Sequence, residues 1–397
     1  MELKPGYKQT ELGVIPEDWE IKKLGELARF RTGPFGSALH KEDYTNNGVP
    51  IVNPMHIVDG KIVATQEMTI TAQRASNLSD FKLRKGDIVI GRRGEMGRCA
   101  VVKASQDGWL CGTGSMIIRT SPLASAGFLR LVLSSPPIIA AIENASVGST
   151  MINLNQSVLA GLNVALPTSK KEQETISSSI EAVVAQAEAL QSLITKKQRV
   201  KQATMQELLT GKRRLPGFEG EWEVKRLGDV AHIKTGSRNN EDKTDDGEYP
   251  FFVRSDNVER ISSYSYDCEA VLVPGEGRIG EIFHYIKGRF DVHQRVYAIT
   301  RFAQEISGRF IHCYMAMNFG SWAMQNTVKA TVDSLRLPTF QTFEMWLPPT
   351  KEEQDAIAGV LTEIEAELAT LEARKNKAQM VKQGMMQQLL TGKIRVV

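Results

Sequence analysis

Most of the architecture of this 397-residue chain follows from a stretch that is written twice. Residues 166–212 and 347–393 both open with Leu-Pro, continue through Lys-x-Glu-Gln and close with Leu-Leu-Thr-Gly-Lys, 181 positions apart and without a gap. A shorter pattern, Trp-Glu-x-Lys-Lys/Arg-Leu-Gly-Glu/Asp, starts at Trp19 and again at Trp222. A repeat of this length indicates a duplicated structural unit. We expect two similar modules at a fixed separation, as suits a ligand with two half-sites.

The repeated stretches have the periodicity of long helices. Their apolar residues step alternately by three and four, which is the seam of a two-helix coiled coil. The seam residues are Ile176, Ile180, Val183, Ala187, Leu190 and Ile194 in one copy, and Ile357, Leu361, Ile364, Leu368 and Leu371 in the other. About 40 helical residues would span roughly 60 Å. Because one chain holds both copies, we expect them to pair antiparallel within the molecule; dimerisation through the same seam is the alternative.

Strand-like and helical runs together predict an α+β fold, with two mixed globular domains separated by the paired helices in an internal pseudo-twofold repeat. Apolar runs bounded by Gly, Asn and Asp predict strands at 49–52, 87–90 and 116–118, and a helix at 128–133. The predicted borders are an N-terminal arm at 1–16, globular domains at 17–166 and 214–346, and helical segments at 167–213 and 347–397.

Composition excludes several classes of protein. There is no run of about 18 apolar residues for a membrane span, and the N-terminus has no apolar signal core, so we expect a cytoplasmic protein. The four cysteines are scattered, which argues against a structural zinc site. The net charge of +3 does not indicate nucleic-acid binding. Lys and Arg do gather near both helix ends, where they could complement the helix dipole or face DNA phosphates or a partner.

No catalytic, cofactor-binding or metal-binding residue is expected in this chain. Residues 275–280 fit GxGxxG, but a dinucleotide site needs a helix after the glycines and the next residues predict a strand. Residues 135–138 and 347–350 contain Pro-Pro without the aromatic residue of amino-methyltransferases, so we interpret them as helix punctuation. The six histidines lack metal-ligand spacing. Glu172-Gln173 and Glu353-Gln354 open the helices, and we interpret them as capping or as a partner surface.

Glycine-rich hairpins are the candidate DNA contacts. Glycines let a backbone approach a surface closely, and arginines beside them suit contact with DNA; an ordinary solvated turn is the alternative. A second recurring loop carries hydroxyls that could bind phosphate or cap a helix. The candidate DNA-binding residues, chosen from charge and loop position, are Arg92, Arg93, Arg98, Ser149, Thr150, Arg254, Arg278, Lys329 and Thr331.

With both motifs present twice and in order, the chain resembles the specificity subunit of type I restriction-modification systems over essentially its whole length. The resemblance implies two target-recognition domains, each reading one half of a bipartite site in double-stranded DNA. The helices would act as a ruler and dock two methyltransferase subunits, which carry S-adenosylmethionine and the N6-adenine chemistry. Restriction subunits with motor and nuclease activity would join for cleavage.

What the resemblance assigns to individual residues is limited. DNA-contacting residues vary with the target, so none carries over by motif. The seam residues expected to form the spacer and bind partners are Ile176, Ile180, Val183, Leu190, Ile357, Leu361, Ile364 and Leu371. The alternatives from other classes are a stand-alone DNA-modifying enzyme, which the missing motifs disfavour, and a coiled-coil scaffold that does not bind DNA.

Overall fold

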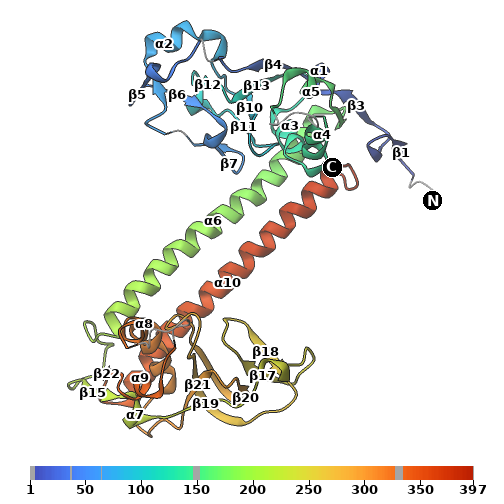
Figure 1. Cartoon of the computed structure of the whole chain (residues 1–397). Helices are drawn as coiled ribbons and strands as arrows, with labels where there is room; N and C mark the ends of the chain where they lie inside the picture. Colours follow the sequence, from blue (N-terminus) through green and yellow to red (C-terminus); the bar gives the residue numbers. More distant parts are fainter. Residues whose placement is uncertain (1–4, 36–37, 64, 146–152, 327–333, 397) are drawn as a thin grey trace. The chain divides into compact units, whose positions relative to one another are not determined.

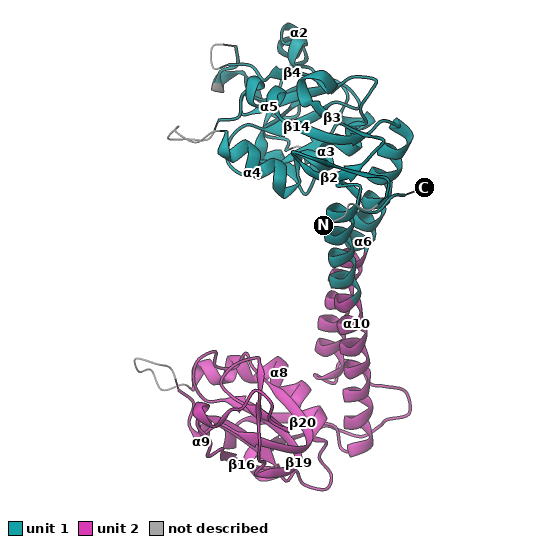
Figure 2. Ribbon diagram, turned by 90° about the vertical axis from the view of Figure 1, so that its right-hand side faces the viewer, with its two compact units in different colours: residues 1–189, 374–397 teal, residues 190–373 magenta. Residues whose placement is uncertain are grey.

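The computed structural model describes residues 5–35, 38–63, 65–145, 153–326 and 334–396 (Figure 1). The chain divides into two compact units (Figure 2): unit 1 is residues 1–189 with 374–397, and unit 2 is residues 190–373. Each unit holds one globular part together with a portion of both repeated helices. The predicted domain borders, which separate the globular parts from the helices, stay predictions about sequence modules, because the compact units divide both helices instead.

The two long helices are α6 (Lys170–Leu208) and α10 (Lys351–Leu389), each of 39 residues. Both begin a few residues after Leu-Pro and end at Leu-Thr-Gly, as the start and stop signals predicted. Gly211 and Gly392 follow the two helices at φ +67° and +69°. A residue in this left-handed conformation commonly terminates a helix, and glycine adopts it without a steric penalty.

Unit 1 contains two four-stranded sheets, with strand orders β11-β10-β13-β4 and β12-β6-β9-β5. The strands predicted at 49–52, 87–90 and 116–118 correspond to β6, β10 and β13, and the predicted helix corresponds to α3. The bounds of the first sheet are β4 (Ala28–Thr32), β10 (Ile88–Gly91), β11 (Cys99–Val101) and β13 (Ser115–Thr120). Those of the second are β5 (Tyr44–Thr45), β6 (Val49–Val52), β9 (Thr69–Ile70) and β12 (Leu110–Cys111). The helices are α1 (Leu24–Leu27), α2 (Ala72–Asn77), α3 (Ala126–Leu133), α4 (Pro136–Asn144) and α5 (Gln156–Gly161).

Two hairpins accompany these sheets in unit 1. The first, β1 (Tyr7–Thr10) with β2 (Gly13–Pro16), lies within the predicted N-terminal arm. The second is β7 (Ile57–Val58) with β8 (Lys61–Ile62). The Tyr7 hydroxyl donates to the Gly392 carbonyl at 3.1 Å, so the arm is tied to the segment that follows α10.

Unit 2 is built on one six-stranded sheet with strand order β16-β21-β19-β20-β17-β18. It is mixed, because β17 pairs parallel with β20 while the other neighbouring strands are antiparallel. The strands are β16 (His232–Thr235), β17 (Tyr249–Phe252), β18 (Val258–Ile261), β19 (Tyr266–Pro274), β20 (His284–Val292) and β21 (Val296–Thr300). The helices are α7 (Leu227–Val230), α8 (Gly308–Gln325) and α9 (Leu337–Gln341).

In each unit a two-stranded ribbon joins the beginning of the globular part to its end. Unit 1 pairs β3 (Trp19–Lys23) with β14 (Asn163–Pro167), and unit 2 pairs β15 (Glu223–Arg226) with β22 (Glu344–Leu347). In each unit the tryptophan at the start of this ribbon lies beside the glycine of a Thr-Gly-Lys motif. A Cβ on Gly392 would lie 3.3 Å from the Trp19 ring, and a Cβ on Gly211 would lie 3.5 Å from the Trp222 ring. The two repeated motifs are therefore each other's packing partners.

The apolar seam residues of the two long helices pack against different parts of the structure along the helices. Ile176 and Ile180 are buried in the core of unit 1, together with α3 and with Leu389 of α10. Ile357 and Leu361 are buried in the core of unit 2. These four side chains are at most 1% exposed, so they anchor the helices to the globular parts and are not available to an outside partner.

Between these anchors the helices contact each other directly. Leu190 and Ile194 form a cluster with Leu368 and Leu371, against which Ile364 packs, all within unit 2. Lys197 pairs with Glu367 at 2.6 Å, and Lys201 pairs with Glu365 at 2.7 Å. Residue numbers rise along α6 as those of their partners fall along α10, so the pairing is antiparallel. The predicted pairing of the two helices within one chain is confirmed.

Membrane-spanning potential is limited in the described part of the chain. No single helix there is long and apolar enough to cross a membrane, and only the bent pair α3 and α4 passes by length and composition.

Candidate nucleic-acid interface

Each unit carries the predicted glycine-rich hairpin at the end of a core strand. In unit 1 the loop joins β10 to β11, and in unit 2 it joins β19 to β20. Gly94 and Gly277 lie at φ +79° and +89°, and Gly97 and Gly280 lie at φ +74° and +71°. These left-handed positions explain why glycine recurs there. A strand, not a helix, follows the glycines of unit 2, which agrees with the rejection of a dinucleotide site.

The two recurring loops meet at the same place in both units. The Leu154 amide donates to the Arg92 carbonyl at 2.9 Å, and the Leu335 amide donates to the Gly275 carbonyl at 2.8 Å. Leu154 and Leu335 are both buried. Each glycine-rich loop is thus fastened to the segment ahead of α5 or α9. The candidates Ser149, Thr150, Lys329 and Thr331 lie outside the described residues, so their role in DNA binding stays a prediction.

Arg92 does not have the placement expected of a DNA contact. Its side chain is buried, with 7% of the residue exposed, and Nε donates to the Leu154 carbonyl at 2.9 Å. Burial lowers the pKa of this guanidinium. The expectation that Arg92 faces DNA therefore has to be corrected: its hydrogen bond holds the loop to the neighbouring segment. Sequence could not reveal this, because the acceptor is a backbone carbonyl 62 residues away.

The other candidates of unit 1 differ in accessibility. Arg93 is exposed, and no described residue forms an ion pair or a hydrogen bond with its guanidinium. Arg98 pairs with Glu95 at 2.5 Å and is about one-third exposed. Arg93 is accordingly the candidate of this loop whose donors are open to a ligand.

In unit 2 the candidates belong to a network of charged side chains. Arg278 pairs with Asp256 and, at 2.8 Å, with Glu281. Arg254 lies 3.3 Å from Glu276, and Arg295 lies 3.1 Å from the same carboxylate. The sequence reasoning missed Glu276 and Arg295. Alignment of the two loops on Gly94 and Gly277 would have drawn attention to Glu276, because it occupies the position of Arg93.

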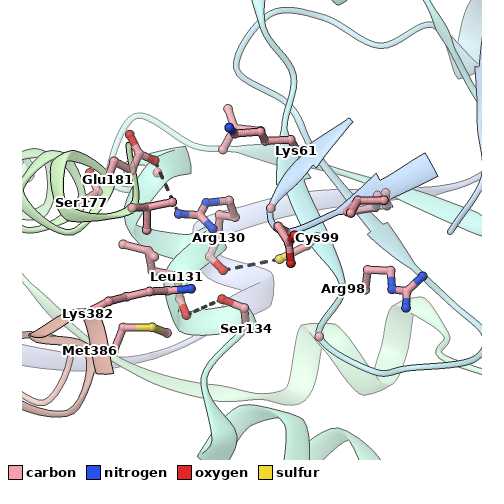
Figure 3. Close-up of a pocket in the computed structure, with 18 of the residues that line it drawn as sticks. Lys61, Arg98, Cys99, Arg130, Leu131, Ser134, Ser177, Glu181, Lys382 and Met386 are labelled. Carbon is pink, nitrogen blue, oxygen red and sulfur yellow. Dashed lines mark hydrogen bonds and ion pairs between the residues drawn. The ribbon is translucent and has the colours of Figure 1, made fainter. Parts of the chain in front are cut away.

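A cavity of about 940 Å³ opens beside the loop of unit 1 (Figure 3). Its walls come from the β7–β8 hairpin, residues 95–99, α3, α4, and the unit 1 portions of α6 and α10. Arg130 lies on its wall 3.5 Å from Glu181, and the Cys99 thiol donates to the Arg130 carbonyl at 3.4 Å. Burial raises the pKa of Cys99 to about 12, so this thiol is protonated and a poor nucleophile at neutral pH.

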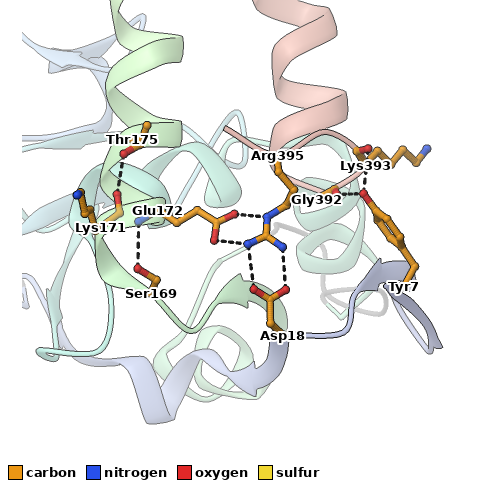
Figure 4. A network of polar contacts seen from close by, with 9 residues as sticks. All are labelled: Tyr7, Asp18, Ser169, Lys171, Glu172, Thr175, Gly392, Lys393 and Arg395. Atoms are coloured by element: carbon orange, nitrogen blue, oxygen red, sulfur yellow. Dashed lines mark hydrogen bonds and ion pairs between the residues drawn. The ribbon is translucent and has the colours of Figure 1, made fainter. Parts of the chain in front are cut away.

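The repeated Glu-Gln dipeptides, interpreted from sequence as capping or a partner surface, connect segments within each unit. In unit 1, Arg395 donates to both oxygens of Glu172 at 2.6 and 2.8 Å and to both oxygens of Asp18 at 2.8 and 2.9 Å (Figure 4). These hydrogen bonds lower the pKa of Asp18. In unit 2, Arg214 donates to both oxygens of Glu353 at 2.7 and 2.6 Å. An arginine six residues beyond the end of each long helix therefore binds the first turn of the other long helix.

The adjacent glutamines fasten the helices to the globular parts. Gln173 accepts from the Ser125 amide at 2.8 Å and donates to the carbonyls of Leu123 and Pro167. Equivalently, Gln354 accepts from the Ser307 amide at 2.9 Å and donates to the carbonyls of Glu305 and Pro348. Ser125 and Ser307 directly precede α3 and α8. Both glutamines are at most 1% exposed, so neither can be a partner surface.

Replacing Gln173 with alanine is expected to destabilise unit 1. It leaves the Ser125 amide and the Pro167 carbonyl buried without their partner, and each such group costs about 1–3 kcal/mol. The free energy of unfolding, measured by urea denaturation followed by circular dichroism, should fall by at least about 2 kcal/mol. Gln202→Ala is the matched control: this glutamine is exposed on the same helix and should change stability by less than about 0.5 kcal/mol. Equal losses in the two variants would contradict the assignment.

Comparison with known proteins agrees with this geometry. The model of the type I restriction modification DNA specificity domain matches residues 16–202 and again 219–380. The chain is 23% identical to the type I restriction enzyme MjaX specificity subunit of Methanocaldococcus jannaschii. The alignment covers 98% of this chain and 97% of that protein. It is 28% identical to the EcoDI specificity subunit of Escherichia coli, over 43% of this chain and 37% of that protein.

A solved structure shares the fold over the whole length. The S subunit of a type I restriction-modification system from M. genitalium superimposes with a TM-score of 0.68 at 16% identity, covering 98% of both chains. The two matches to the family model together span most of the sequence, and each match falls on one copy of the internal repeat. The chain belongs to the family of type I restriction-modification DNA specificity proteins and carries the family's domain in two copies.

Proposed function

We propose that this chain is the DNA sequence-specificity subunit of a type I restriction-modification complex, and that each unit reads one half of a bipartite target in double-stranded DNA. The observation that carries this proposal is the duplicated specificity domain, in which both copies hold a glycine-rich loop against the segment ahead of α5 or α9. Arg93, Arg254 and Arg278 offer exposed guanidinium groups beside these loops. Such donors suit phosphate oxygens and guanine edges.

The proposed partners are two methyltransferase subunits, docked on the helical regions, and restriction subunits with motor and nuclease activity. In this proposal S-adenosylmethionine binds to the methyltransferase, and the specificity chain itself catalyses nothing and acts in the cytoplasm. The duplication supports a pair of like partners, because both units contain the same arrangement of tryptophan motif, helix end and buried glutamine. The internal anchors Ile176 and Leu361 are buried, so docking would involve the outward faces of the helices.

The proposal predicts that methyl transfer depends on a partner. Purified chain mixed with DNA and radiolabelled S-adenosylmethionine should transfer no methyl groups. Addition of the cognate methyltransferase should produce methylation at a single bipartite sequence, detected by sequencing the modified bases. Methyl transfer by the partner-free chain would identify a stand-alone enzyme. Methylation that ignores sequence, with no footprint of the complex on DNA, would identify a scaffold.

A further inference from the structure

The two glycine-rich loops have the same backbone conformation, but their charged positions are opposite in sign. Their register is fixed by equivalent hydrogen bonds: the Arg92 amide donates to Gly114, and the Gly275 amide donates to Arg295, both at 2.9 Å. With the left-handed glycines aligned, Met96 and Ile279 fall together, and both are buried. The three remaining positions are reversed in sign. They are Arg93 against Glu276, Glu95 against Arg278, and Arg98 against Glu281.

Two of these reversals together preserve an internal ion pair. Glu95 and Arg98 pair at 2.5 Å in unit 1, while Arg278 and Glu281 pair at 2.8 Å in unit 2, each across three residues. The attraction between two opposite charges does not depend on which end is positive. The loop therefore keeps its internal ion pair whichever of the two positions carries the positive charge. The choice of sign at each position can then be set by a ligand outside the loop.

The residue just before the first left-handed glycine differs between the two loops both in charge and in its ion-pair partners. In unit 1 it is Arg93, an exposed guanidinium without an ion-pair partner among the described residues. In unit 2 it is Glu276, a carboxylate that is 22% exposed and lies between Arg254 and Arg295. Arginine presents only hydrogen-bond donors, whereas an ionised glutamate presents only acceptors. The flanking arginines offset the repulsion that a bare carboxylate would meet near phosphates.

We propose that Arg93 and Glu276 are equivalent base-reading positions with opposite preferences. This rests on the proposed function. In the major groove, arginine pairs with the O6 and N7 acceptors of guanine, and glutamate accepts from an amino group such as cytosine N4. Arg93 therefore selects a guanine in the half-site read by unit 1, and Glu276 selects a base with an exposed amino group in the half-site read by unit 2.

The asymmetry between the loops favours DNA over a protein partner as the ligand. Two copies of one methyltransferase need like surfaces, and the features common to both units supply them. A surface whose charge is inverted between the units suits two different ligands, as two unlike half-sites are.

The test uses the full complex with its methyltransferase, and a DNA library in which each base of the wild-type target is varied in turn. Arg93→Gln should reduce the preference for guanine at one position of one half-site by roughly 5- to 150-fold, the equivalent of about 1–3 kcal/mol. The other half-site should be unchanged. Glu276→Gln should alter one position in the opposite half-site only. The control is Arg29→Gln, which makes the same substitution at an exposed arginine of β4. It should leave the base preference at every position of the target unchanged.

Arg93→Lys keeps the charge but removes the planar fork. It should weaken the guanine preference, because an ammonium group contacts guanine O6 and N7 without the fork geometry, while the dependence of binding on salt stays the same; its thermal unfolding provides a check on folding. Equal weakening of every sequence by Arg93→Gln would make Arg93 a phosphate contact and overturn the proposal. Loss of methyltransferase binding would assign the loop to the protein partner, and unchanged preferences would also refute base reading. If the wild-type complex shows no sequence preference at all, the proposed function itself fails.

Discussion

Replacing Arg214 with alanine should strongly destabilise unit 2. The Glu353 side chain is fully buried, and Arg214 binds both of its oxygens. Breaking a buried ion pair by removing one partner costs about 3–5 kcal/mol, because the other charge stays buried without compensation. For a unit of this size the midpoint of thermal unfolding should fall by on the order of 10 °C. Scanning calorimetry of the full chain would measure the shift.

The neighbouring arginine provides a matched control. Arg213 pairs with Glu207, but the two side chains are 68% and 48% exposed. Exposed pairs contribute about 0–1 kcal/mol, so Arg213→Ala should scarcely move the transition. Adding Glu353→Gln to Arg214→Ala removes the buried charge and should recover part of the loss. If Arg213→Ala and Arg214→Ala were equally stable, or if the double variant were worse than the single one, the buried pair would not be what holds these segments together.

The second large effect concerns the distance between the half-sites. Each long helix begins in one unit and ends in the other. Adding seven residues to both, after Ala189 and after Ala373, keeps the phase of the seam and lengthens each helix by about 10 Å. At roughly 3.4 Å per base pair this equals about three base pairs. We expect the complex to methylate targets with a spacer two or three base pairs longer and with both half-sites unchanged.

The measurement is sequencing of modified bases in DNA exposed to the complex of each variant. An insertion in one helix alone should inactivate the complex, because it leaves apolar seam residues without partners. A double-insertion variant that stays active on the original spacing would show that the helices do not set it.

Local sequence patterns predicted much of the fold, because they reflect contacts between near neighbours in the chain. Steps of three and four residues predicted α6 and α10, and Leu-Pro and Thr-Gly-Lys marked their ends. Apolar runs bounded by turn residues predicted β6, β10 and β13. The same reasoning located the glycine-rich hairpins, since left-handed backbone positions favour glycine wherever they occur.

Charge and loop position were weaker guides to individual side chains. Arg92 and Arg93 are adjacent in a mainly basic loop, yet one is buried against Leu154 and the other is exposed. The choice depends on a carbonyl from a distant segment. Likewise, Gln173 looked like part of a helix cap, and only its contact with Ser125 identified it as the joint between helix and globular part.

The sequence by itself determined that the chain contains two copies of one unit, and that each copy has a tryptophan motif, a globular part and a long helix. It did not determine which copies of the motifs meet. Trp19 could pack equally well on Gly211 or on Gly392, since both glycines end identical Leu-Leu-Thr-Gly-Lys segments. In the tertiary structure Trp19 packs on Gly392, and Arg395 reaches back to Asp18 and Glu172. The antiparallel pairing of the helices decides this, because it returns the end of α10 to the unit in which α6 begins.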